Sequence, residues 1–122
     1  MYTYAATVTR VVDGDTFEAD VDVGFYHWCK QRFRLMGYNA PEVHGAETSL
    51  GLQASAILSS MLLRKVVIIR THKGDAFGRW LADVEVDRGD VVEALISGGW
   101  GVAWNGKGDR PKFDWTKEYP LR

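Results

Sequence analysis

Three short segments of the chain combine residue types that bind cations and phosphate groups. Two acids flank a glycine in residues 13–16, and an asparagine and a glutamate flank Ala-Pro in residues 39–42. The third segment is residues 75–79, in which Asp-Ala-Phe-Gly precedes Arg79, and a second arginine, Arg34, lies five residues before Asn39. Carboxylate and amide oxygens are hard ligands for divalent cations, and the planar arginine fork matches the oxygens of a phosphate. Taken singly, each segment also has an ordinary explanation, as a hairpin turn, a loop or the start of a strand.

The segment around Asp15 has the pattern of a β-hairpin. Residues 5–12 are rich in Val and Thr and end at the turn signal Asp13-Gly14. From Thr16 to Val23 apolar and polar residues alternate strictly, as in a strand that is buried on one face, and Val23 belongs to the apolar face. Asp15 falls at the end of that apolar face. A carboxylate there is costly unless it binds a cation or accepts hydrogen bonds.

The same periodicities place the other elements. Residues 30–36, 66–69 and 79–86 predict three more strands, the last with Trp80 on its buried face. Apolar residues at the helical period predict one longer helix over about 48–64. The capping box Asp90-x-x-Glu93 predicts a short helix over about 90–98.

These elements predict a mainly β fold of the α+β class. Five short strands, with the longer helix between the third and the fourth, are typical of a five-stranded barrel of the OB-fold type. The tail from about residue 105 is dominated by Gly, Lys, Asp, Arg and Pro, so we expect irregular structure there.

Composition excludes several classes of protein. The 122 residues, 46% of them hydrophobic, suffice for one domain over 1–122 but not for two with separate cores. The single cysteine, Cys29, excludes an intramolecular disulfide and a zinc site built from cysteines. Nothing approaches a run of 18 apolar residues, and the start lacks the features of a signal peptide. We therefore expect a monomeric cytoplasmic protein that does not bind a membrane.

The charges are balanced overall but segregated along the chain. The formal net charge is −1, which disfavours a protein that binds nucleic acid through bulk charge. Residues 1–27 nevertheless carry a net −4, and residues 28–82 a net +5. Solvated strand faces would account for most of this banding. It also permits a positive surface beside a focused acidic site.

In their order and spacing, the three segments resemble the staphylococcal nuclease (thermonuclease) family. The resemblance runs from about Val8 to about Lys107 and includes the helix that follows Pro41-Glu42. It implies a metal-dependent phosphodiesterase that hydrolyses DNA, RNA or both, with a preference for single strands. It also implies that Ca²⁺ is the cofactor, as hard oxygen ligands would favour.

The resemblance assigns a metal site to the two acidic segments. Asp15 and Asn39 would be side-chain ligands, and the backbone carbonyl of Ala40 would be a third. Asp13 would lie in the outer sphere. The best-known family members have aspartate in place of Asn39 and threonine in place of Ala40. The lost negative charge implies weaker calcium binding and leaves room for another divalent metal.

The resemblance also assigns catalytic and substrate-binding residues. Arg34 and Arg79 would grip the scissile phosphate, and Glu42 would orient or deprotonate the attacking water. The 5′ oxygen would leave, which gives 3′-phosphate products. Phe77 and Trp104 would stack on the substrate base.

Two further departures from the family pattern affect these expectations. The Gly- and Pro-broken tail leads us to expect that the long basic C-terminal helix of the archetype is missing, and the chain is nearly neutral where the archetype is strongly basic. Non-specific affinity for DNA should therefore be lower. A compact chain of this kind would suit a phage or a mobile genetic element.

Two other functions stay open at this point. A non-catalytic OB-fold module that binds single-stranded nucleic acid would keep the basic segment 28–82 and Trp104. It would have no need of Asp15, Arg34 and Glu42 together with Arg79. A pure protein-interaction module on the same barrel explains these residues even less well.

Overall fold

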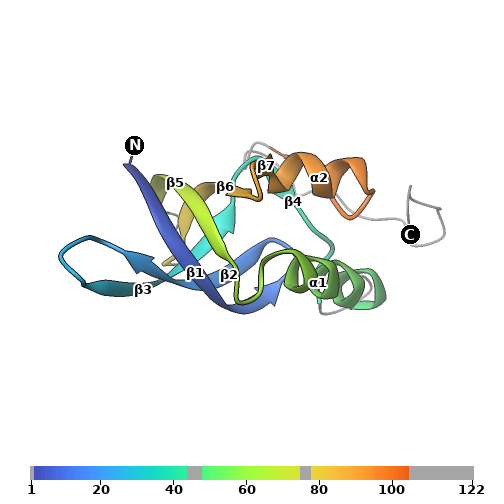
Figure 1. Cartoon of the computed structure of the whole chain (residues 1–122). Helices are drawn as coiled ribbons and strands as arrows, with labels where there is room; N and C mark the ends of the chain where they lie inside the picture. The colour runs from blue at the N-terminus through green and yellow to red at the C-terminus, as the bar shows by residue number, and fades with distance from the viewer. Residues whose placement is uncertain (1, 44–47, 75–77, 105–122) are drawn as a thin grey trace.

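The structure, a computed structural model, describes residues 2–43, 48–74 and 78–104. The sheet contains five longer strands: β1 (Tyr2–Asp13), β2 (Thr16–Asp22), β3 (Trp28–Leu35), β5 (Val66–Gly74) and β6 (Trp80–Val86). Three strands have two residues each: β4 (Tyr38–Asn39), β7 (Gly89–Asp90) and β8 (Val102–Ala103). The helices are α1 (Thr48–Leu62) and α2 (Val91–Ser97). Figure 1 shows both helices at the same end of the barrel.

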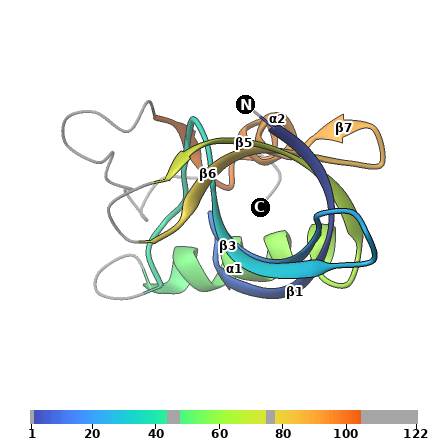
Figure 2. The same cartoon turned by 90° about the vertical axis from the view of Figure 1, so that its left-hand side faces the viewer.

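The five longer strands close into a barrel. Their order is β3-β2-β1-β5-β6, with antiparallel neighbours, and a parallel pairing of β3 with β6 joins the two edges. Figure 2 looks into the ring that results. The helix α1 lies in the chain between β3 and β5 and packs against β1. These features confirm the predicted mainly β, α+β architecture with an OB-fold-type barrel.

The core follows from the alternation along the strands. Inward residues of β2 and β3 are buried, and the rings of Phe17 and Phe33 stack with centroids 5.5 Å apart. Leu58 and Leu62 of α1 cover one end of this core. Burying side chains of this size contributes about 1.5–3 kcal/mol each relative to exposure.

Both predicted helices are present with slightly different ends. α1 ends at Leu62, two residues before the predicted end, because Arg64 takes a left-handed conformation with φ of 65°. The capping residue Asp90 accepts hydrogen bonds from the backbone N–H groups of Val92 and Glu93, as the capping box predicts. The predicted irregular tail lies outside the described residues. Within the described residues, no helix is long and apolar enough to cross a membrane.

The prediction that Trp80 is buried is wrong. Its side chain is 43% exposed, and Val23, which was also expected on the apolar face, is 46% exposed. Both residues line a cavity at the end of the barrel away from α1, where the described residues leave their side chains partly exposed. The indole Nε1 of Trp80 instead donates a hydrogen bond to Gln31 Oε1 at 3.2 Å. Alternation gives the face of a strand, but not whether the barrel continues at that level.

Two glycines let α1 approach the acidic segments closely. A Cβ on Gly14 would lie 2.7 Å from the Cβ of Ala40 and 2.8 Å from the Cβ of Ala54 in α1. A Cβ on Gly51 would overlap with the backbone carbonyl of Glu42. The helix therefore packs directly against both the β1–β2 turn and residues 39–42.

Gly51→Ala tests this support. In an ordinary helix interior the change stabilises by about 0.8–1 kcal/mol, because alanine has the higher helix propensity. Here we expect a loss of about 1–3 kcal/mol, since the new methyl group must displace the backbone of Glu42. Urea denaturation measures the difference. Gln53→Ala, at an exposed position of the same helix, is the control and should be neutral or slightly stabilising; a similar gain for Gly51→Ala would contradict the close approach.

Candidate functional site

Asp15 lies buried in the turn that joins β1 to β2. Only 4% of its surface is exposed, and each carboxylate oxygen has hydrogen-bond donors. Oδ1 accepts from the Thr16 hydroxyl at 3.0 Å, and Oδ2 accepts from the backbone N–H of Ala40 at 3.2 Å. The structure thus satisfies the prediction that a carboxylate at this position needs partners.

Arg34 joins the turn to the following loop. Its Nη2 atom lies 3.4 Å from Asp15 Oδ2, 3.2 Å from the carbonyl oxygen of Tyr38 and 3.5 Å from Asn39 Oδ1. Asn39 is fully buried. One guanidinium nitrogen therefore holds the side-chain oxygens of both predicted metal ligands close together.

Trp104 covers the same guanidinium group. The central carbon of the Arg34 guanidinium lies 5.5 Å from the centroid of the Trp104 ring, within the range of a cation–π interaction. The backbone N–H of Trp104 donates to the carbonyl of Gly37 at 3.0 Å, which fixes the backbone of Trp104 beside this site. Trp104 was predicted to contact substrate, and it lies beside the arginine predicted to bind the phosphate. Phe77 lies outside the described residues.

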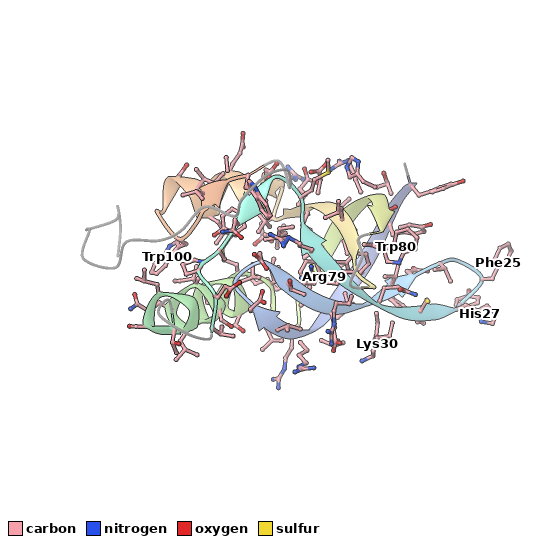
Figure 3. All side chains as sticks on the ribbon, turned by 180° about the vertical axis from the view of Figure 1, so that it is seen from behind. Phe25, His27, Lys30, Arg79, Trp80 and Trp100 are labelled. Atoms are coloured by element: carbon pink, nitrogen blue, oxygen red, sulfur yellow. The ribbon has the colours of Figure 1, made fainter. Side chains whose placement is uncertain are left out.

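Arg79 reaches the same turn from the other edge of the barrel. Its Nη1 donates to the Thr16 hydroxyl at 3.4 Å, and Arg79 immediately precedes β6. Because β6 pairs with β3, Arg34 and Arg79 contact neighbouring residues of one turn. Figure 3 shows Arg79 near the middle of this face, between Trp80 and Trp100.

Glu42 follows β4 by three residues, in the segment that begins with Ala40. Its surface is exposed, while the preceding Pro41 is buried. Ala40 is also buried, and its N–H anchors the loop to Asp15. An exposed carboxylate on an anchored loop can meet solvent water, which is what the predicted role of Glu42 requires.

Asp13 has an unusual protonation equilibrium. Its Oδ1 accepts a hydrogen bond from the backbone N–H of Asp15 at 3.1 Å. Burial, together with the neighbouring Asp15 carboxylate, raises the pKa of Asp13 from 3.8 to about 6. The two carboxylates of Asp13 and Asp15 therefore repel each other in the turn when both are ionised. A bound cation would remove this repulsion.

The donor set suits a hard divalent cation. Carboxylate oxygens of Asp15, the amide oxygen of Asn39 and the nearby Asp13 are all oxygen ligands of the kind that Ca²⁺ prefers. Among the described residues there is no group of three or more His, Cys, Asp and Glu that could hold a metal. The candidate set is of a different kind, because it relies on an asparagine and a backbone carbonyl.

Two contributors to this site carry little or no signal in the sequence. The Thr16 hydroxyl bridges Asp15 and Arg79, and its only signal was its place directly after Asp15. The carbonyl of Tyr38 holds Arg34. Every residue carries such a carbonyl, so nothing in the sequence singles it out.

Asp13→Asn isolates the titration of this carboxyl group, because the asparagine oxygen can still accept from the Asp15 N–H. The folded chain binds more protons than the unfolded chain between pH values near 3.8 and about 6. The metal-free wild-type protein should therefore lose stability as the pH rises through this window. Calorimetry in chelator should show the melting temperature of the wild type falling, relative to Asp13→Asn, from about pH 4 to about pH 7. Parallel curves would contradict the raised pKa.

One comparison with known proteins identifies the family. A model of the family described as staphylococcal nuclease homologue matches residues 32–120. The match includes Arg34, Asn39, Glu42 and Arg79, and it begins after the turn that carries Asp15. A comparison with curated proteins finds no match. The matched range covers most of the chain, and the chain belongs to the staphylococcal nuclease homologue family.

Proposed function

We propose that the chain is a calcium-dependent phosphodiesterase that hydrolyses DNA, RNA or both. The observation that carries this proposal is the convergence of Arg34 and Arg79 on consecutive residues of the turn that holds Asp15. Membership of a nuclease family supports a nucleic acid as the substrate. A positive pair beside a set of hard oxygen ligands suits a phosphodiester, whose charge must be neutralised as water attacks.

Asp15, Asn39 and the carbonyl of Ala40 would hold the metal, with Asp13 in the outer sphere. When bound, the cation would supply electrostatic stabilisation of the phosphate oxygens. Asn39 in place of an aspartate lowers the charge of this set, so the affinity for calcium should be modest and another divalent cation could compete.

Arg34 and Arg79 would bind the scissile phosphate. Each guanidinium can donate two parallel hydrogen bonds to phosphate oxygens and stays charged throughout the reaction. Arg34 is already held by Asp15, Asn39 and Trp104, so little side-chain entropy remains to be lost when substrate binds. This preorganisation favours transition-state binding.

Glu42 would accept the proton of the attacking water. General-base catalysis of this kind contributes about 10²–10⁴-fold to a rate. Attack in line with the 5′ oxygen expels that oxygen and leaves a 3′-phosphate. The ring of Trp104, next to Arg34, would stack on a base beside the scissile phosphate, which favours single-stranded or frayed substrates.

The first test is cleavage of labelled single-stranded DNA and RNA with calcium or with a chelator. Glu42→Gln and Arg79→Ala should each lower turnover by about 10²-fold or more, with the fold intact. Arg10→Ala is the matched control, since Arg10 is exposed, is paired with Glu18 and lies outside the site. It should change turnover little.

Cleavage that persists in chelator would contradict the metal dependence. Cleavage unaffected by both substitutions would contradict the assignment of the site. Binding of single strands without any cleavage would favour the non-catalytic OB-fold module instead.

Asn39→Asp tests the metal site directly. The change adds an ionised oxygen beside Asp15, so calcium should bind about tenfold more tightly or better. Titration calorimetry measures this affinity without any need for activity. Gln53→Glu, which adds the same charge on the exposed face of α1, should leave the affinity unchanged. Equal affinities for Asn39→Asp and the wild type would exclude Asn39 as a ligand.

A further inference from the structure

The end of the barrel away from α1 contains an apolar cavity of about 810 Å³. Its lining comes from the start of β1 and β6, the end of β2 and β5, several residues along β3, and Val23 and Met36 beside these strands. Aromatic and aliphatic side chains form most of the wall, among them Tyr2, Tyr4, Val21, Phe33, Trp80 and Leu81. Tyr2 and Trp80 are largely or partly exposed at its rim. We call this cavity the barrel mouth.

The β2–β3 hairpin extends beyond the barrel at the same end (Figure 1). Its tip presents Phe25 and Tyr26, which are 93% and 100% exposed. Figure 3 shows Phe25 at the far end of the hairpin. Val23 and Cys29, which flank the tip, line the barrel mouth of their own chain. A knob of two aromatic rings and an apolar hole thus lie next to each other on one molecule.

The tip is also held in a costly backbone conformation. Phe25 and Tyr26 have φ values of 57° and 60°, in the left-handed region that Asn and Gly favour at such turns. The N–H of His27 donates to the carbonyl of Gly24 at 2.9 Å, which closes a tight turn around them. Two aromatic residues exposed at one point form an apolar surface of the kind that marks a contact site, and residues that tolerate this turn conformation better would not supply it.

We propose that two copies of the chain associate through these features. The tip of each copy inserts Phe25 and Tyr26 into the barrel mouth of the other, about a two-fold axis. Such an isologous contact is self-complementary, because each copy supplies both the knob and the hole. The protein is then a homodimer in place of the expected monomer.

The area available matches what a stable dimer needs. A buried aromatic side chain covers about 150–250 Å², so four of them cover about 600–1,000 Å². The facing walls of the two barrel mouths lose a similar area, which gives a total of about 1,200–2,000 Å². This is the usual size of a specific protein interface. The net charge of −1 per chain adds little repulsion between the copies.

The charges beside the tip favour a protein over a nucleic acid as the occupant. On the outer face of the hairpin, Arg32 pairs with Glu18 at 2.7 Å and Lys30 lies 3.8 Å from Asp20. These cations are already neutralised by acids of β2, so a polyanion would gain little there. The candidate nuclease site lies at the other end of β2, and the dimer does not depend on the proposed function.

Sedimentation of the full chain from about 1 μM to about 1 mM tests the proposal. The wild type should shift with concentration from 13.7 kDa to twice that mass. The double variant Phe25→Asn, Tyr26→Gly places the preferred Asn-Gly pair in the same turn while it removes both rings. It should weaken dimerisation by about 100-fold or more. Its melting temperature, measured under dilute conditions where both proteins are monomers, should be equal to or above that of the wild type.

Leu52→Gln is the matched control. It removes an exposed apolar side chain from α1, at the other end of the barrel, and should dimerise like the wild type. A wild type that stays monomeric over the whole concentration range would overturn the proposal. This holds even if a small aromatic probe or another protein binds the barrel mouth, because the occupant would then not be a second copy of the chain. Dimerisation that survives in the double variant, or that Leu52→Gln abolishes equally, would also overturn it.

Discussion

The buried contact between Asp15 and Arg34 is the constraint on which the site depends. Removing a carboxylate and a guanidinium from water costs several kcal/mol per ion unless their remaining hydrogen-bonding groups find partners. The fold meets this requirement with the Thr16 hydroxyl, the Ala40 N–H, the Tyr38 carbonyl and the Trp104 ring. The turn, the loop after β3 and the segment after α2 are thus held by one pair of charges.

The closure of the barrel determines which residues can join this pair. β3 pairs with β2 on one side and with β6 on the other, so it brings the turn before β2 next to the start of β6. Arg79 contacts Thr16 for this reason, although 63 positions separate them. The close approach of α1 at Gly14 and Gly51 then fixes the position of the backbone at Ala40 and Glu42. Asp15, Thr16, Arg34 and Asn39 thus lie on strand ends or in a short turn, which are more rigid than long loops.

Much of this arrangement could be predicted from local patterns. The strict alternation after Thr16 gave the strand and marked Asp15 as a buried acid, and the box at Asp90 gave the start of α2. Alternation reports only the side of a strand, so it could not show that Trp80 stands where the barrel ends. The holding contact from Tyr38 is made by a backbone carbonyl, which leaves no trace in the residue type. The order of the three polar segments indicated a common site only because it resembles that of the staphylococcal nuclease family. Periodicity alone did not show that any two of the segments lie together.

The parallel joint between β3 and β6 has a consequence for how the chain folds during synthesis. Hairpin contacts form early because they close short loops, whereas this joint must close a long one and pays the larger loss of chain entropy. Until it forms, Arg34 and Arg79 stand on separate edges of an open sheet. Without this pairing, nothing in the hairpin contacts holds Arg79 beside the turn that Arg34 contacts. The two arginines therefore meet at the turn only after β6 has paired with β3. A ribosome-bound chain that has not yet extended past β6 cannot form the phosphate-binding pair.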